Sequence, residues 1–319
     1  MITKTSQPLT RYPTRTTRTR GFILSALAAA TIGLIGAPLP SHAQTILWKL
    51  DDTATPLTAT DSSGNGNDGT VYGNVTGGGA SGVSGTAFSG FTSAASNIRN
   101  TLGTGAGRAN LTLSLWFTNP GSSGHNTLVG LGKDSLTNSD RAWEIFLSDA
   151  DPAGARTLTF LYGQNSGFSR AYQSTTFTIE SDAWYYLALV YQGSTTSTTG
   201  SDFTIYLAKQ GDDSLGTPLL SGTTVALYTA TANNTLYVGG VTEAYHGGGD
   251  RYEHFVAGYF GGGIDQVSVW KDTLLDASQL DADFARGSVP EPATVALFFG
   301  IVAILLVHRW RQRYSSFVS

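Results

Sequence analysis

The chain has 319 residues and no cysteine, which excludes a disulfide framework and any thiolate metal site. Of its 19 basic residues, five precede residue 44 and three follow residue 288, whereas 22 of the 23 acidic residues lie between these positions. The middle segment therefore has 11 basic and 22 acidic residues, a net charge of −11. This balance excludes a nucleic-acid partner on electrostatic grounds.

Residues 1–43 have the features of a secretory signal peptide. A basic segment comes first, an apolar stretch over residues 22–37 follows, and two prolines then precede the small residue Ala43. We predict cleavage between Ala43 and Gln44. The alternative is an uncleaved N-terminal membrane anchor, which is disfavoured by the prolines and by the strand pattern that begins at Ile46.

Residues 44–288 form one predicted domain of short β-strands. Residues 111–117, Leu-Thr-Leu-Ser-Leu-Trp-Phe, alternate in the manner of a half-buried strand. Loops rich in glycine, serine and threonine, such as residues 76–85, separate the strands. The other predicted strands are residues 141–148, 156–162, 184–192, 203–208, 235–239 and 264–270. This pattern predicts an all-β, antiparallel β-sandwich.

One helix is predicted near the end of this domain. Asp276 can cap its N-terminus, and Gln279 stands three residues later in the capping-box position. Leu280 and Phe284 then fall on one helical face, and Gly287 is expected to end the helix.

Two motifs lie at opposite ends of the domain. Residues 61–69 read Asp-Ser-Ser-Gly-Asn-Gly-Asn-Asp-Gly, and residues 263–267 read Gly-Ile-Asp-Gln-Val. With the strands at 111–117 and 184–191 between them, this order resembles the laminin G-like, concanavalin A-like jelly roll, and the resemblance covers residues 44–288. It implies a jelly-roll sandwich over that range.

The same resemblance implies a structural calcium ion. Relatives of this fold hold calcium between the first strand, the early turn and the last strand, which gives Asp51, Gly66, Asn67 and Asp265 as candidate ligands here. Calcium prefers oxygen ligands from carboxylates, amides and backbone carbonyls, which these residues supply. The alternative is that the polar residues of the early turn form Asx turns while Asp265 makes local hydrogen bonds.

Residues 289–319 contain Pro290-Glu291-Pro292, an apolar run over 293–307 and a basic cluster. As a helix the apolar run is about 22 Å long, which is short for a hydrocarbon core of about 30 Å. This order resembles the PEP-CTERM sorting signal. The resemblance implies recognition of the Pro-Glu-Pro motif by an exosortase, and export across the inner membrane of a Gram-negative bacterium to the cell surface or extracellular matrix. A plain single-pass membrane anchor is the alternative.

The domain lacks the catalytic pattern of laminarinase-type glycoside hydrolases, which share the expected fold. Those enzymes use a Glu-x-Asp-x-x-Glu strand to place two carboxylates on one sheet face. None of the four glutamates lies in this pattern, and the three histidines, interpreted as loop or surface residues, lack zinc-site spacing. These residues are Glu144, Glu180, Glu243, Glu253, His125, His246 and His254. We therefore predict a protein that is not an enzyme.

Four aromatic residues are candidates for stacking on a sugar. Alternation along their strands places Trp116 and Tyr206 on the outer face of the sandwich, away from the core. Tyr245 and Tyr252 flank a glycine run in a late loop. The alternatives are that a loop or the late helix covers the first pair, and that the late loop is a mobile turn.

These observations predict an exported, non-catalytic cell-surface or matrix protein that binds polysaccharide in an exopolysaccharide or biofilm. Its partners would be an exosortase, an extracellular polysaccharide and, through the C-terminal helix, the membrane. One alternative is a structural matrix or protein-adhesion component without a sugar site. A polysaccharide hydrolase or lyase is the less favoured alternative.

Overall fold

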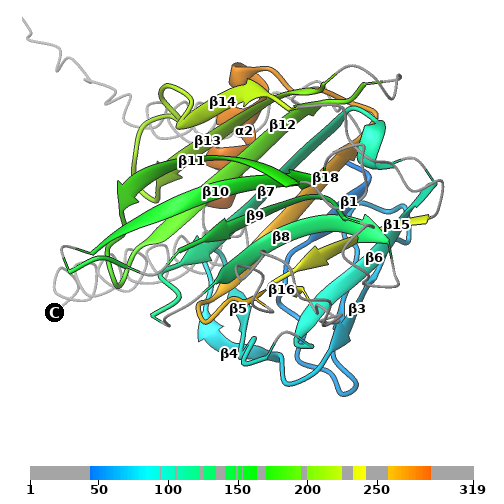
Figure 1. Ribbon diagram of the computed structural model, residues 1–319. Coiled ribbons are helices and arrows are strands. Elements are labelled where there is room, and N and C mark those ends of the chain that lie inside the picture. The colour runs from blue at the N-terminus through cyan, green and yellow to red at the C-terminus, as the bar shows by residue number, and fades with distance from the viewer. Residues whose placement is uncertain are drawn as a thin grey trace, which may run out of the picture. The chain divides into compact units, whose positions relative to one another are not determined.

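The computed structural model describes residues 44–288, except residues 94, 105, 122–124, 134–140, 149, 153, 164–169, 195–199, 225–232 and 242–257. Within these ranges the protein is all-β, with a single α-helix and one turn of 3-10 helix, η1 (Ala106–Arg108). The strands form two large antiparallel sheets and one two-stranded sheet (Figure 1). The prediction of an all-β antiparallel sandwich is confirmed at this level.

The first large sheet, sheet A, is built around the long strands β7, β12 and β18. In order across the sheet its strands are β14 (Leu220–Thr223), β13 (Asp202–Lys209), β12 (Trp184–Gln192), β7 (Leu111–Thr118), β18 (Ile264–Lys271), β5 (Thr86–Ser89) and β4 (Thr76–Ser81). Strand β1 (Ile46–Trp48) also pairs with β18. The first and last strands of the domain therefore meet in sheet A.

The second large sheet, sheet B, has strands β9, β8 and β15 at its centre. In order its strands are β11 (Arg170–Thr178), β10 (Ala155–Gly163), β9 (Arg141–Leu147), β8 (Asn126–Lys133), β15 (Asn233–Val238), β6 (Asn97–Thr104), β3 (Gly69–Tyr72) and β2 (Thr58–Ala59). The small sheet pairs β16 (Gly240–Val241) with β17 (Gly258–Tyr259).

Alternating side chains of both sheets form the main core. Leu113 and Leu115 of sheet A and Ile145 and Phe160 of sheet B all have no exposed surface and belong to one hydrophobic cluster. Burying such a side chain stabilises the fold by roughly 1.5–3 kcal/mol. The residues between them in each strand point away from this core, which defines an outer face on each sheet.

Helix α2 (Ala277–Ser288) begins with the predicted capping box. The Gln279 backbone N–H donates to Asp276 Oδ1 at 2.9 Å, and the Asp276 N–H donates to Gln279 Oε1 at 2.9 Å. Gly287 lies inside the helix and does not end it. A Cβ at this position would lie 2.3 Å from Trp116 Nε1, so glycine is needed for the close approach of α2 to sheet A.

The predicted strands are confirmed to within a few residues, but residues 76–85 were wrongly predicted to be a loop. Strand β4 occupies Thr76–Ser81 and pairs with β5 through an irregular register. Gly77 is required there because a Cβ would lie 2.2 Å from the Asp52 carbonyl oxygen. The glycines that predicted a loop therefore permit a close-packed edge strand.

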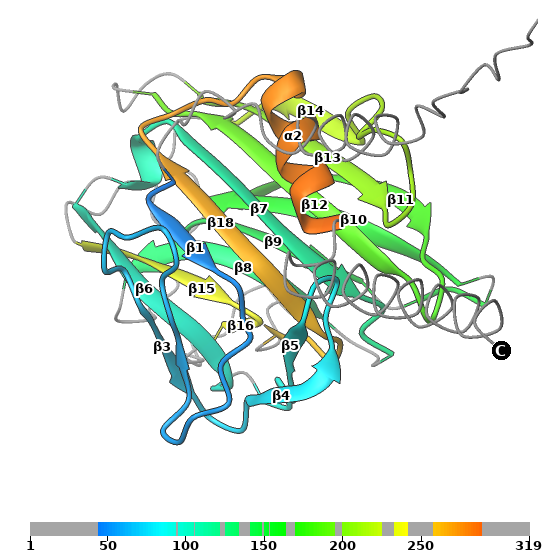
Figure 2. The ribbon, with the colours of Figure 1, turned by 180° about the vertical axis from the view of Figure 1, so that it is seen from behind.

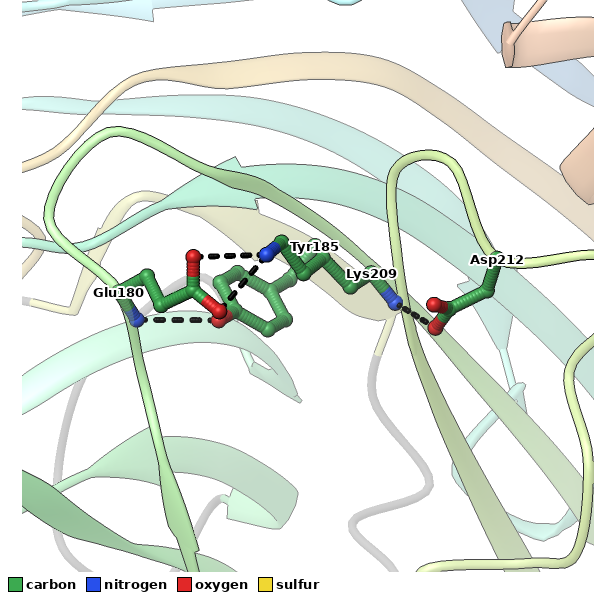
Figure 3. Close-up of polar contacts among 4 residues, drawn as sticks. All are labelled: Glu180, Tyr185, Lys209 and Asp212. Carbon is green, nitrogen blue, oxygen red and sulfur yellow. Dashed lines mark hydrogen bonds and ion pairs between the residues drawn. The ribbon is translucent and has the colours of Figure 1, made fainter.

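An exposed ion pair connects the segment after β11 to the end of β13 (Figure 3). Lys209 Nζ donates to both carboxylate oxygens of Glu180 at 2.7 Å, and the Glu180 N–H donates to the Tyr185 hydroxyl at 3.0 Å. The neighbouring Glu180 carboxylate raises the pKa of Lys209. This contact lies at the surface, where ion pairs contribute little to stability.

Candidate functional site

The outer face of sheet A is covered by α2 (Figure 2). Trp116 points away from the core, as predicted, but it is only 1% exposed and stacks on Phe284 of the helix, with ring centroids 5.3 Å apart. The prediction that Trp116 stacks on a sugar is therefore wrong, because the helix occupies its ring face. Tyr206 is partly buried and packs beside the same cluster.

A buried carboxylate holds the helix to this face. Asp283 Oδ2 accepts hydrogen bonds from the Ser114 hydroxyl at 2.7 Å and the Tyr186 hydroxyl at 2.8 Å. Burial raises the pKa of Asp283, although these hydrogen bonds and Arg286, 3.4 Å from Oδ1, act in the opposite direction. Burial and the Asp283 carboxylate together raise the pKa of Tyr186. The hydrogen bonds from Ser114 and Tyr186 fasten α2 to sheet A, whereas the contact with Arg286 lies within the helix.

Two of the four candidate calcium ligands contact the same turn, residues 82–86. Asp51 Oδ1 accepts from the Thr86 N–H at 2.7 Å, and Asp265 Oδ2 accepts from the Val83 N–H at 2.8 Å. Burial, with the Asp51 carboxylate adding to it, raises the pKa of Asp265 to about 8. A cation bound by Asp51 and Asp265 would offset the cost of burying the negative charge of Asp265.

The other two candidate ligands belong to a separate hydrogen-bonded loop. The Asn67 N–H donates to Asp61 Oδ2 at 2.9 Å, its carbonyl accepts from Trp48 Nε1 at 2.9 Å, and Gly66 has a positive φ of 73°. Asp61 also accepts from the Ser63 N–H, which makes the Asx turn of the alternative interpretation. Four hydrogen bonds to its carboxylate lower the pKa of Asp61 despite burial. Among the described residues no group of three His, Asp or Glu could hold a metal ion.

The outer face of sheet B carries a histidine paired with a buried glutamate. Glu144 lies between Trp143 and Ile145 on β9, which both point into the core, so its side chain points outward. It is nevertheless 1% exposed. Its Oε1 accepts from the Thr127 hydroxyl at 2.7 Å and lies 3.0 Å from His125 Nε2.

This pair has a defined geometry. The His125 ring stacks on Phe146 with centroids 3.6 Å apart, so both the ring plane and one ring nitrogen are fixed. Beside an ionised Glu144, which could only accept a hydrogen bond, the imidazole would carry its proton on Nε2 and its lone pair on Nδ1. The arrangement can therefore accept a proton at Nδ1 while Glu144 stabilises the resulting imidazolium.

The same face continues across the sheet to a cationic residue. Glu144 is opposite Gly130, Gly130 is opposite Tyr237, and Tyr237 is opposite Arg99. Three strand spacings separate Glu144 from Arg99, or about 14 Å between backbones. Sheet B therefore carries an acid–base pair and a guanidinium on one surface.

Sequence reasoning missed both members of the pair. His125 lies in a loop directly before β8, as predicted, but its side chain is only 11% exposed and is paired with Glu144. Period-two alternation along β9 could have placed Glu144 on the outer face. The candidate ligands Tyr245 and Tyr252, the cleavage residue Ala43, the Pro290-Glu291-Pro292 motif and residues 293–307 lie outside the described residues.

No protein-family model and no curated protein matches this sequence. Among solved structures, the Trypanosoma rangeli sialidase matches in complexes with 2,3-difluorosialic acid and with sialic acid. The TM-scores are 0.52 and 0.51, at 14% and 15% identity. Both matches cover 78% of this chain, which spans only 33% and 34% of the matched sialidase chains. The carbohydrate-binding module CBM40 of the Ruminococcus gnavus IT-sialidase matches at a TM-score of 0.39 and 14% identity, covering 56% of this chain and 84% of the module.

These matches correct two predictions, that the protein is non-catalytic and that it is not an enzyme. The matched proteins are sialidases, and this chain covers about a third of each of them. At such identities the likeness establishes the fold alone. No helix among the described residues has the length and hydropathy to cross a membrane.

Proposed function

We propose that the domain is a carbohydrate-active enzyme whose site lies on the outer face of sheet B. The observation that carries this proposal is the buried Glu144 carboxylate, which holds the His125 imidazole in one orientation. Phe146 fixes the ring plane and Thr127 fixes the carboxylate. The corresponding face of sheet A is covered by helix α2, which packs on Trp116.

His125 is the proposed general base, and Glu144 is its positioning residue. Elimination needs a base to take a proton from the sugar ring, and the resulting imidazolium can pass it to the leaving oxygen. Hydrolysis needs a base to take a proton from water and, in addition, an acid to protonate the leaving oxygen. A well-placed histidine supplies a factor of about 10²–10⁴ to either reaction. The His125–Glu144 pair on the outer face of sheet B thus favours a polysaccharide hydrolase or lyase, the less favoured alternative from the sequence.

Turnover of a polysaccharide panel by the purified protein tests this proposal. Reducing ends measure hydrolysis, and ultraviolet absorbance of unsaturated ends measures elimination. His125→Gln keeps a hydrogen-bond donor for Glu144 but no base, so we expect turnover to fall at least about 100-fold. Lys209→Met removes a cation on sheet A and should leave turnover unchanged. Full activity in His125→Gln would overturn the assignment, as would the absence of turnover in the wild-type protein.

Calcium binding is proposed at Asp51 and Asp265, within a jelly roll of the laminin G-like type. The meeting of the two carboxylates on the turn at residues 82–86 supports it, and the separate contacts of Gly66 and Asn67 argue against their serving as ligands without rearrangement. Calcium titration should raise the melting temperature of the wild-type protein but not of Asp51→Asn. An unchanged melting temperature in millimolar calcium would contradict the site.

Export and sorting are proposed from the two terminal segments. The basic–apolar–Ala43 order supports a signal peptide, and Pro290-Glu291-Pro292 followed by the apolar residues 293–307 supports exosortase processing at the membrane. Mass spectrometry of the protein from an exosortase-bearing host should find an N-terminus at Gln44 and a shortened C-terminus. A Glu291→Ala variant that is processed normally would contradict the sorting role.

A further inference from the structure

Arg99 lies on the outer face of sheet B between two tyrosine rings. Its guanidinium carbon is 4.3 Å from the ring centroid of Tyr72 and 5.3 Å from that of Tyr237. Tyr72 is 43% exposed, the highest value among the large hydrophobic side chains of the described residues. The stack therefore presents a cation and an aromatic face to solvent on the sheet that carries His125.

The guanidinium is held in place without being neutralised. Arg99 Nε donates to Asn97 Oδ1 at 2.7 Å, and Asn97 is itself fully buried. Among the described residues no carboxylate forms an ion pair with Arg99, and its two terminal nitrogens have no hydrogen-bond partner. An arginine fixed in this way is preorganised for an anion that fits its planar fork.

A second unsatisfied group lies nearby on the same face. Thr235 precedes Tyr237 by two residues on β15, so both side chains point outward from the core. Thr235 is 2% exposed, and its hydroxyl oxygen has no hydrogen-bond partner. Buried hydroxyls are normally paired, so this one is an unsatisfied polar group beside the Arg99 stack.

We infer that Arg99 binds the carboxylate of an acidic sugar in the substrate, with the Tyr72 ring stacking on the sugar or its neighbour. This inference rests on the proposed function, because it names the substrate class of the same face. A carboxylate can accept two parallel N–H bonds from the guanidinium fork, which gives orientation as well as affinity. The binding position lies about 14 Å from Glu144, so the chain must extend over several sugar units.

The net charge limits how acidic this substrate can be. The segment between residues 44 and 288 carries −11, and such a field repels a dense polyanion over distances of about 8 Å at physiological salt. A single carboxylate flanked by neutral sugars avoids most of that repulsion and still makes the short contact with Arg99. The substrate class is therefore a largely neutral glycan with isolated uronic or sialic acid residues.

Binding measured on matched glycan pairs tests the inference. In each pair only one member carries a carboxylate: xylotriose with one glucuronic acid substituent is compared with xylotetraose, and 3'-sialyllactose with lactose. We expect the wild-type protein to bind at least one acidic member at least tenfold more tightly than its neutral partner. Arg99→Met should abolish that preference, and the matched charge-removing control Lys209→Met should keep it. Polygalacturonate, a dense polyanion, should bind more weakly than the preferred acidic glycan.

The outcomes separate this inference from the proposed function. If no pair shows an acid preference, or if Arg99→Met keeps it, the inference is overturned even where His125-dependent turnover is found. If the preference depends on Arg99 but no polysaccharide is turned over, the binding position stands and the enzymatic proposal fails. Should Arg99→Met unfold, Tyr72→Ala at the exposed ring replaces it, and unchanged affinity in that variant contradicts the stacking.

Discussion

The outer faces of the two sheets use buried carboxylates in different ways. On sheet A, Asp283 accepts hydrogen bonds from Ser114 and Tyr186 beneath α2, and the helix closes over Trp116. On sheet B, Glu144 accepts from Thr127 and contacts the His125 ring. Both carboxylates are almost fully buried, so burial does not distinguish them. They differ in their partners, because Asp283 holds a helix and Glu144 contacts the proposed base.

This difference separates two kinds of variant. Changes on the covered face of sheet A should alter the free energy of unfolding and leave glycan chemistry intact. Changes at His125 should alter turnover and cost less stability, because the imidazole joins the short segment before β8 to Phe146 and Glu144 of β9 and holds no helix. The predictions below test the sheet A half of this contrast, ordered by the size of their expected effect.

Trp116→Ala should give the largest loss of stability. Trp116 is 1% exposed, stacks on Phe284 and meets the Tyr186 ring edge-on at 5.3 Å, so its removal leaves a cavity under α2. The free energy of unfolding should fall by about 3–5 kcal/mol. Urea denaturation measures this loss, and Tyr72→Ala, at an exposed aromatic, is the control with a small effect. A loss below about 1 kcal/mol would show that α2 does not cover this ring.

Asp283→Ala should have the next largest effect. The buried hydroxyls of Ser114 and Tyr186 would lose their acceptor, and an unsatisfied buried donor costs about 1–3 kcal/mol. Asp283→Asn keeps an acceptor oxygen and should be much milder. If the two variants unfold at the same urea concentration, the hydrogen bonds do not fasten the helix.

Asp283→Asn should also change how the stability of the protein depends on pH. Burial raises the pKa of Asp283 above its ordinary value of 3.8, so the folded protein holds a proton that the unfolded chain has lost. Its contribution to stability is therefore present at low pH and is lost as pH rises from about 3.8 through the raised value. Melting curves of Asp283→Asn should lack this decline. An identical slope in wild type and variant would contradict the assignment.

The long strands of sheet A and the helix were predicted well, because residues 111–117 alternate with a period of two and the helix has a capping box. The strand at 111–117 and the cap at Asp276 depend on neighbours in the sequence, which a single chain reveals. Even there, the covering of Trp116 could not be predicted. It depends on α2 returning to β7 from more than 150 residues away, with Gly287 allowing close contact.

Sheet B was harder to predict, and its site harder still. Strand β8 has Gly130 and Gly132 where a predicted strand would have β-branched residues, so it was not predicted at all. Without β8, nothing in the sequence brings His125 beside Glu144, because their contact depends on the register of β8 with β9 and on a bulge between Thr127 and Val129. When two residues of an acid–base pair come from different strands, the sequence shows only which face of its strand each residue points to. It does not show that the two residues meet.

The smallest expected effect is that of Lys209→Met, which tests whether a charge without burial matters in this protein. The ion pair with Glu180 is short, with both N–O distances at 2.7 Å, but its side chains are 38% and 62% exposed, so water and salt screen it. The Glu180 N–H also donates to the Tyr185 hydroxyl, which keeps this segment in place without the lysine (Figure 3). We expect the melting temperature to stay within experimental error of wild type, at low and at high salt. A decrease in melting temperature that disappears at high salt would contradict this expectation. It would show that the exposed pair between the segment after β11 and the end of β13 does stabilise the sandwich.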